Sequence, residues 1–261
     1  MAQSPLLQIE QLTKHFGGLV AVRDYRLRIA PGEIVGLIGP NGAGKTTIFN
    51  LISGHLRPSA GRIVFRNREI TNLRADHVAR LGIARTFQNI RLFPHLTVQV
   101  NVLIGAQLHR RYSALDTLLG LPSFHQGERR LASRTAEILA LLGLGAVADL
   151  EVRSLPLGVQ RKVEIARALA LDPVILLLDE PAGGLTAAES GEVMALLRQL
   201  RDRLGLTIFL IEHDMRVVMG LCDRVQAINF GQLIAEGSPG VIREHPAVIE
   251  AYLGVDAVAE R

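Results

Sequence analysis

Short apolar runs separated by glycine-rich breaks fill the first forty residues of the chain. The runs LLQIEQL, VAV, YRLRI and IVGLI alternate with the breaks GG at 17–18 and PGE at 31–33. This alternation is typical of β-strands joined by tight turns. The run GRIVF at 61–65 has the same character. We therefore predict that the N-terminal region is rich in β-strands.

Two continuous apolar runs of strand length lie in the second half of the chain. VILLL at 174–178 and TIFLI at 207–211 match strands that are buried on both faces of a parallel sheet. Between them, Thr186-Ala187-Ala188-Glu189 predicts a capping box, in which the Thr and Glu side chains satisfy the first free N–H groups of a helix. Strand, helix and strand in this order predict a βαβ unit.

The middle of the chain has a helical pattern, which begins near Val100. Apolar residues such as Ile138, Leu141 and Leu142 recur on one face of a helix predicted over 131–144. These patterns together predict an α/β protein with a helical insertion near residues 90 to 165. No flexible linker divides the chain into two independent domains.

Composition narrows the class of protein. Hydrophobic residues make up 48% of the 261 residues, which is ample for a core, and no apolar run approaches the roughly 18 to 20 residues of a membrane span. Glu10 and Gln11 stand where an export signal would need an apolar run. A single cysteine, Cys222, excludes an internal disulfide and fits a reducing compartment. We therefore expect a cytoplasmic protein.

The net charge of +4 does not identify a partner. A basic balance is compatible with nucleic acid or with an anionic membrane surface. Here the arginines are scattered among acidic residues, without a dense basic run or interleaved aromatics. This pattern favours a solvated, arginine-rich surface, and we expect no nucleic-acid partner.

The stretch GPNGAGKTT after the strand IVGLI is the clearest chemical motif. It matches G-x-x-x-x-G-K-[ST], in which glycines let backbone N–H groups surround a phosphate at a helix N-terminus. Lys45 would reach the β and γ phosphates, and Thr46 would offer a hydroxyl to Mg²⁺. The alternative is a glycine turn that only caps a helix, but the complete motif behind a strand favours nucleotide binding. The predicted cofactor-binding residues are Gly39, Pro40, Asn41, Gly42, Ala43, Gly44, Lys45, Thr46 and Thr47.

Charged side chains follow both buried strands, at the edge where ligands of open α/β sheets bind. Asp179 is expected to hold Mg²⁺, and Glu180 to polarise an attacking water. His213, in LIEHD, would lie near the γ-phosphate. The alternatives are acids that simply leave a strand for solvent and a structural histidine. The phosphate-binding loop upstream favours catalytic roles.

At these motifs the chain resembles the nucleotide-binding subunits of ABC transporters, over nearly its whole length. GPNGAGKTT is similar to that family's Walker A motif and VILLLDEP to its Walker B motif, with Glu180 as catalytic glutamate. His213 resembles the switch histidine. Gln88, in RTFQNIRLFPHLTV, resembles the Q-loop glutamine, which joins Mg²⁺ and the γ-phosphate to the transmembrane subunit. Phe16, in KHFGG, matches the aromatic that stacks on adenine; without the resemblance it is better explained by hairpin packing.

The resemblance implies a P-loop NTPase core of the RecA-like type, with an N-terminal antiparallel β subdomain and a helical insertion. Residues 1–261 would form a single ABC ATPase domain. Within it, approximately 1–90 and 160–261 would form the nucleotide-binding core with its β subdomain, and approximately 90–160 the helical subdomain. ATP and Mg²⁺ are the implied cofactors. The implied location is the cytoplasmic face of the inner membrane, as a peripheral subunit.

LPLGVQ stands where that family carries its signature loop, usually LSGGQ, which closes over the ATP of a partner subunit. The resemblance implies that Leu157 and Gly158 contact this nucleotide. Pro156 replaces the serine, and the hydrogen bond lost is worth about 1.5 to 3 kcal/mol when made to a charged group. Thr186 stands where many relatives have aspartate or asparagine. We expect a weaker or asymmetric half-site that still hydrolyses ATP.

The finer resemblance is to subunits that energise uptake of branched-chain amino acids. HFGGLVAV, RTFQNIRLF, IEHDMRVVMGLCDRV and HPAVIEAYLG carry it, together with the insertion LLGLPSFHQGERR. It implies transmembrane permease subunits and a second ATPase subunit, in a homodimer or heterodimer, as partners. The insertion would contact the permease or form a self-contained helical subdomain. Urea or amide uptake, lipopolysaccharide export, a soluble ATPase acting on nucleic acid, and a weakly active partner subunit are the alternatives.

Overall fold

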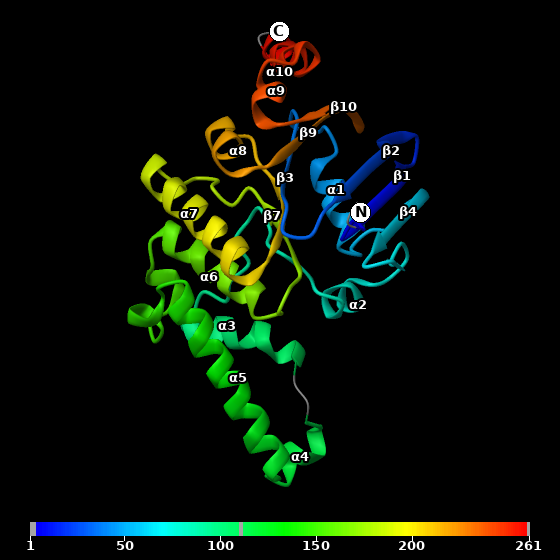
Figure 1. Ribbon diagram of the computed structural model, residues 1–261. Coiled ribbons are helices and arrows are strands. Elements are labelled where there is room, and N and C mark those ends of the chain that lie inside the picture. Colours follow the sequence, from blue (N-terminus) through cyan, green and yellow to red (C-terminus); the bar gives the residue numbers. More distant parts are fainter. Residues whose placement is uncertain (1–3, 110–111, 260–261) are drawn as a thin grey trace.

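The protein contains two β-sheets, as the computed structural model shows; helices flank the larger sheet, and the smaller sheet lies at the side of the molecule (Figure 1). The structure describes residues 4–109 and 112–259. The smaller sheet is antiparallel and has the strand order β2-β1-β4-β5. Its strands are β1 (Leu7–Phe16), β2 (Leu19–Ile29), β4 (Ala60–Phe65) and β5 (Arg68–Glu69). The β-rich N-terminal region predicted from the apolar runs is therefore confirmed.

The larger sheet forms the centre of the molecule and has the strand order β10-β9-β3-β8-β7-β6. Strands β9, β3, β8, β7 and β6 run parallel, and β10 pairs antiparallel with β9. The strands are β3 (Ile34–Ile38), β6 (Ile83–Arg85), β7 (Ile175–Asp179), β8 (Thr207–Ile211), β9 (Arg224–Asn229) and β10 (Gln232–Gly237). Because β3, β8 and β7 are neighbours and parallel, their carboxyl ends lie at one edge of the sheet.

Alternate side chains of the central strands point to opposite faces, and both faces are covered. In β7, Leu176 and Leu178 belong to one buried cluster, whereas Ile175 and Leu177 belong to the other. All five residues of β3, of β7 and of β8 are buried. This double burial explains why these strands read as continuous apolar runs rather than as alternating ones.

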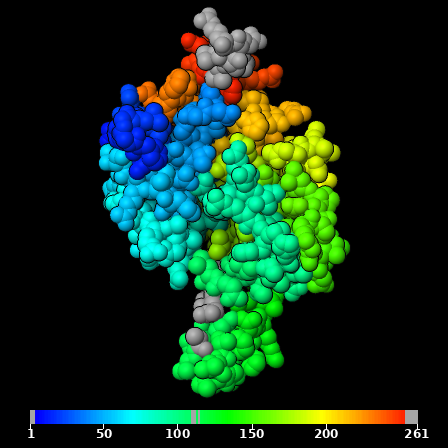
Figure 2. All heavy atoms as spheres, turned by 180° about the vertical axis from the view of Figure 1, so that it is seen from behind, coloured from blue at the N-terminus to red at the C-terminus, as the bar shows by residue number. Residues whose placement is uncertain are grey.

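Helices cover the central sheet and form a separate projection. They are α1 (Lys45–Ile52), α2 (Ala75–Arg80), α3 (Val98–Ala106), α4 (Ala114–Leu118), α5 (Pro122–Leu141), α6 (Leu157–Leu169), α7 (Ala187–Leu204), α8 (Met215–Leu221), α9 (Pro239–Arg243) and α10 (Pro246–Ala259), with 3-10 turns at Gln107–His109, Gly145–Val147 and Val152–Ser154. The α4 and α5 helices extend as a narrow tip, green in Figure 2. Among the described residues, no helix has the length and apolarity that crossing a bilayer requires. The exact division of the chain near residues 90 and 160 stays a prediction.

Of two predictions about helices, the structure confirms one and differs from the other. The capping box at the start of α7 is confirmed, since Thr186 Oγ1 accepts from Glu189 N (3.3 Å) and Glu189 Oε2 accepts from Thr186 N (2.9 Å). The helix predicted over 131–144 was wrong at both ends, because α5 starts at Pro122 and ends at Leu141. Its first turns are largely solvent-exposed and lack apolar periodicity, and Gly143 adopts a left-handed conformation (φ 67°) just beyond its end.

A buried hydroxyl links the two sheets. Tyr25 of β2 is fully buried, and its Oη donates to Gln226 Oε1 of β9 at 2.6 Å. Burial raises the pKa of Tyr25 well above its ordinary value, with the charge of Glu236 acting in the same direction. The hydroxyl therefore stays protonated and remains a donor throughout the neutral range.

Replacing Tyr25 by Phe should destabilise the fold with little change in shape. The substitution leaves Gln226 Oε1 buried without this donor, at a cost of about 1 to 3 kcal/mol in the free energy of unfolding. Urea denaturation of Tyr25→Phe and of the parent protein measures the difference. An unchanged unfolding midpoint would show that the amide does not depend on this hydroxyl.

Candidate nucleotide site

The predicted phosphate-binding loop joins β3 to α1. It begins at Gly39, directly after the buried strand, and α1 begins at Lys45. Lys45 is 8% exposed, and its Nζ donates to the carbonyl oxygens of Gly39 (2.6 Å) and Pro40 (2.8 Å). Burial lowers the pKa of Lys45, and the charges of Glu180 and Asp179 oppose this shift. The ammonium group is therefore held by the loop, within the field of two carboxylates.

Two glycines of this loop are required by close packing of backbone on backbone. Gly39 has φ 154°, and a Cβ there would lie 2.2 Å from the carbonyl oxygen of Ile228. Gly44 has φ 101°, and a Cβ there would lie 2.5 Å from the carbonyl oxygen of Ala21. The loop is thus wedged between the end of β9 and strand β2. This packing is a second reason for glycine, beside the phosphate contact that the sequence predicts.

A cleft of about 490 Å³ opens over the loop. Phe16, at the end of β1, lines it with a ring that is 45% exposed, and Lys14 Nζ lies 5.1 Å from the ring centroid. Phe230, in the turn between β9 and β10, also lines the cleft and is 84% exposed. The full lining is Phe16, Leu19, Val20, Ala21, Asn41, Gly42, Ala43, Gly44, Lys45, Thr46, Thr47, Gln88, Glu180 and Phe230. Two exposed aromatic rings therefore border the same cleft as the phosphate-binding loop.

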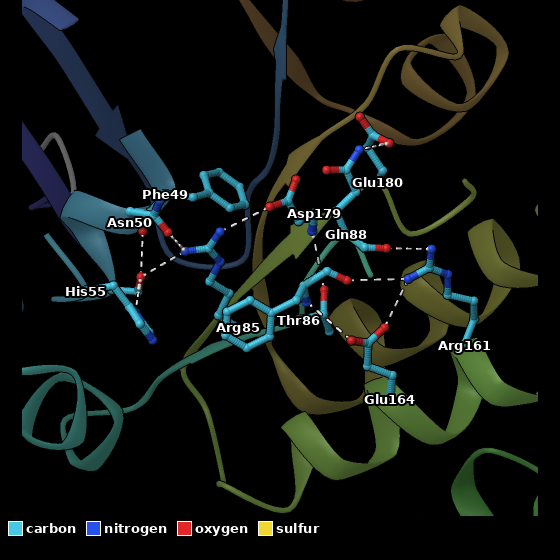
Figure 3. Close-up of polar contacts among 12 residues, drawn as sticks. Phe49, Asn50, His55, Arg85, Thr86, Gln88, Arg161, Glu164, Asp179 and Glu180 are labelled. Atoms are coloured by element: carbon cyan, nitrogen blue, oxygen red, sulfur yellow. Dashed lines mark hydrogen bonds and ion pairs between the residues drawn. The ribbon is translucent and has the colours of Figure 1, made fainter. Parts of the chain in front are cut away.

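The predicted catalytic side chains meet at the carboxyl ends of β7 and β8. Gln88 Nε2 donates to Glu180 Oε2 at 3.1 Å, and His213 Nδ1 lies 3.6 Å from Glu180 Oε1 (Figure 3 shows the first contact). Glu180 has φ 50°, a left-handed conformation that is uncommon for a residue with a side chain. Such strain is typical of sites that hold a functional group in one orientation. The sheet thus brings together residues that are far apart in sequence.

Arg85, which sequence reasoning missed, holds the carboxylate next to Glu180. Its Nη2 donates to Asp179 Oδ2 at 3.1 Å, and the two side chains are 5% and 4% exposed. Its Nη1 donates to Asn50 Oδ1 at 2.6 Å, and the guanidinium lies over the rings of Phe49 and Phe87 (Figure 3). Burial raises the pKa of Asp179, and the neighbouring Arg85 opposes that shift. In the sequence, the only hint of this role is an arginine at the end of a short apolar run, Ile83-Ala84-Arg85.

The comparisons with known proteins agree with this geometry. A family model described as "ABC transporter" matches residues 22–183, and one described as "Branched-chain amino acid ATP-binding cassette transporter" matches residues 232–258. The chain is 44% identical to the high-affinity branched-chain amino acid transport ATP-binding protein LivG of Escherichia coli K12, over 96% of this chain and 98% of LivG. The chain belongs to the ABC transporter ATP-binding family. It is an ABC ATPase, an enzyme that binds and hydrolyses ATP.

A second relative and a solved structure extend the comparison. The ABC ATPase is 42% identical to BraF, a high-affinity branched-chain amino acid transport ATP-binding protein of Pseudomonas aeruginosa, over 96% of this chain and 98% of BraF. It is similar to the crystal structure of the ADP conformation of MJ1267, an ATP-binding cassette of an ABC transporter, with a TM-score of 0.85 and 31% identity. That match covers 97% of this chain and 100% of the other. The predicted ABC-type P-loop fold is confirmed.

The ABC ATPase holds its two strand-end loops together through Glu212, a second residue that sequence reasoning missed. Glu212 is 1% exposed, and its carboxylate accepts from Ala182 N (2.9 Å) and His213 N (3.2 Å). Burial raises the pKa of Glu212, and these backbone donors oppose the shift. The loop after Glu180 and the loop that carries His213 are therefore fixed to one carboxylate. Glu212 stands directly before His213 in LIEHD, but from the sequence we assign a function only to the histidine.

A helix of the ABC ATPase starts within LPLGVQ, the stretch that stands at the position of the family's signature loop. Helix α6 begins at Leu157, and Pro156 occupies the N-cap without a side-chain hydrogen bond. Leu157 is 40% exposed, whereas Gly158 is buried, and a Cβ on Gly158 would lie 2.9 Å from Glu189 Oε1. Neither residue is part of the described lining of the phosphate-loop cleft. Their expected contact is with a partner's nucleotide, and that contact stays a prediction.

Loss of the Arg85 charge should destabilise the ABC ATPase strongly. In Arg85→Met the Asp179 carboxylate stays buried without its counterion, which costs about 3 to 5 kcal/mol in the free energy of unfolding. Arg85→Lys keeps a positive charge but not the forked geometry, so we expect a smaller decrease in the free energy of unfolding. Urea denaturation of both variants measures this. Arg62→Met, which removes an exposed ion pair with Glu69, is the control and should change stability by less than about 1 kcal/mol.

Proposed function

We propose that this ABC ATPase energises an importer of branched-chain amino acids. The observation that carries the proposal is the match of residues 232–258 to the branched-chain amino acid family model. LivG and BraF, which are named for that transport, align with nearly the whole chain. The subunit would act as a peripheral protein at the cytoplasmic face of the inner membrane.

The residues of the cleft fit a bound Mg²⁺-ATP. The backbone N–H groups of residues 39–47 and the N-terminus of α1 suit the phosphates, and Phe16 suits the adenine ring. Mg²⁺ prefers oxygen ligands and is commonly shared between one or two protein groups and phosphate oxygens. The Thr46 hydroxyl and the Gln88 amide oxygen, which belong to residues that line the cleft, are such groups, and the buried Asp179 carboxylate beside Arg85 is the third. Bound Mg²⁺ would neutralise charge that develops on the phosphates.

Hydrolysis would use the side chains at the ends of β7 and β8. Glu180 accepts a hydrogen bond from the water that attacks the γ-phosphate and so raises its nucleophilicity. His213, 3.6 Å from that carboxylate, donates to the γ-phosphate or to the water. Gln88, already within hydrogen-bond distance of Glu180, orients the same water. Lys45 stabilises the charge on the leaving and transferred phosphates.

The partners would be transmembrane permease subunits and a second ATPase subunit. Apolar side chains are exposed between the Q-loop and the tip of the projection: Phe93 is 48% exposed, Ile104 38% and Leu118 81%. Exposed apolar side chains of this kind are typical of protein contact sites. Leu157 and Gly158 would contact the ATP bound to the second ATPase subunit. Because the signature loop of this subunit is altered, we expect the second ATPase subunit to carry a complete signature loop.

Glu180→Gln should abolish hydrolysis while ATP still binds. An amide cannot accept the proton of the attacking water, so we expect a fall in kcat of about 100-fold or more. Phosphate release with Mg²⁺-ATP measures it, and light scattering tests whether a closed dimer accumulates with ATP but not with ADP. Glu192→Gln changes an exposed carboxylate on α7 and is the matched control. A monomer that binds ATP would favour the alternative of a weakly active subunit that needs a different partner.

The transported molecule is tested in the assembled system. Proteoliposomes that contain the permease subunits, the ATPase subunits and the external binding protein should accumulate leucine when ATP is inside. The same assembly with Glu180→Gln should not. Urea offered in place of leucine is the control for the related uptake systems. Uptake of urea but not of leucine would overturn the proposed cargo and leave the ATPase assignment intact.

A further inference from the structure

Helix α6 carries a buried ion pair one turn beyond the signature loop. Arg161 Nη1 donates to Glu164 Oε2 at 3.1 Å, and the two side chains are 8% and 3% exposed. Both face the interior of the ABC ATPase, whereas Lys162, between them in sequence, pairs with the exposed Glu192 at 2.7 Å. The helix therefore carries a buried pair within itself and, next to it, a more exposed pair that joins it to α7.

The buried pair holds the main chain of the Q-loop. Arg161 Nη2 donates to the carbonyl oxygen of Gln88 at 3.0 Å, and Phe87 N donates to Glu164 Oε1 at 3.2 Å. Arg161 Nη1 also reaches the carbonyl oxygen of Phe87, at 3.5 Å. Figure 3 shows these contacts beside the Gln88–Glu180 hydrogen bond. Two charged side chains on one helix thus hold the main chain of two successive residues, Phe87 and Gln88.

The same arginine lies against the loop that follows Glu180. A Cβ on Gly183 would lie 3.7 Å from Arg161 Nη2 and 3.2 Å from the carbonyl oxygen of Glu180. At the start of α6, Leu157 lies against Gly184, where a Cβ would meet the leucine side chain at 3.2 Å. The signature helix, the Q-loop and the loop after the catalytic glutamate therefore converge on Arg161.

Stability alone does not account for this arrangement. A buried ion pair gains little over apolar residues of the same volume, because both charges must be desolvated. Burial raises the pKa of Glu164, as expected when a carboxylate is desolvated. The hydrogen bond from the Phe87 N–H and the charge of Arg161 oppose this shift. The pair instead restricts geometry. Forked guanidinium and carboxylate groups form good hydrogen bonds only when their partners lie within a narrow range of positions.

We propose that Arg161 and Glu164 are positioning residues, which tie the signature helix to the Q-loop backbone so that Gln88 reaches Glu180 only while α6 holds its present position. Engagement of the signature loop by a second subunit would then be transmitted through α6 to the hydrolysis site. This inference rests on the proposed roles of Gln88 and Glu180. Under this proposal Arg161 and Glu164 act through the Q-loop backbone and not by contacting ATP.

Hydrogen exchange tests the tie without relying on activity. Arg161→Lys replaces the fork by a single ammonium, which cannot serve the Gln88 carbonyl and Glu164 together. Glu164→Gln keeps the side-chain shape and serves as the second variant if Arg161→Lys folds poorly. We expect amide exchange in residues 86–92 to rise about tenfold, with exchange within α6 unchanged. Lys162→Gln, the matched control on the same helix, should leave both regions unchanged. Unchanged exchange at 86–92 in both variants would overturn the proposal.

A double-mutant cycle tests the functional part. We expect Arg161→Lys to lower kcat about 10- to 100-fold, with ATP affinity changed less than about threefold, because the phosphate-binding loop is untouched. In a Gln88→Ala background the same substitution should cost less than about threefold, since its effect passes through Gln88. An equal loss in both backgrounds would overturn the coupling. If the parent protein showed no ATPase activity, the proposed function would fail, and hydrogen exchange would still decide whether the tie exists.

Discussion

The buried pair of Arg85 and Asp179 is the interaction on which the nucleotide site depends. Removing two charges from water is costly, and Arg85 offsets part of that cost through hydrogen bonds to Asn50 and Ser53 and through contacts with two aromatic rings, although its Nε has no hydrogen-bond partner among the described residues. Phe49 and Asn50 belong to α1 and Asp179 ends β7, so the pair links the helix behind the phosphate-binding loop to that strand. Thr86, the next residue, accepts from Asp179 N at 3.3 Å, and the Q-loop follows directly. One arginine thereby connects three of the segments that border the site.

The sheet order then decides which side chains meet. Because β7 and β8 are parallel neighbours, Glu180 and His213 emerge at the same edge, and Glu212 ties their loops together. The remaining geometry comes from strained or tightly packed backbone. Glu180 takes a left-handed conformation, and Gly39 leaves no room for a side chain against the end of β9. These main-chain positions therefore help to fix where the loops of the site lie.

Much of this could be predicted from the sequence, for reasons that are local. The strand–glycine loop–helix pattern at 34–52, the strands predicted at 174–178 and 207–211 and the capping box at Thr186 are each encoded within a short stretch of sequence. The structure has all of these elements, with the first of the two strands shifted by one residue to Ile175–Asp179. The parts that could not be predicted depend on contacts between distant segments. Arg85 is 94 residues from Asp179, and Arg161 is 73 from Gln88, so no spacing rule connects them. The start of α5 was missed because its exposed turns have no apolar face.

The first residues of α6 pack against other residues of the same protein. Gly158 is buried against Glu189, whose pKa is lowered chiefly by its hydrogen bonds to Thr186 and also by the backbone of Gly158, and Leu157 lies against Gly184. The surface that a second cassette would meet is thus preorganised during folding. Association then orders fewer side chains, and less conformational entropy is lost on binding. In the proposed contact with a second subunit, this rigidity would offset part of the affinity lost with the serine hydroxyl.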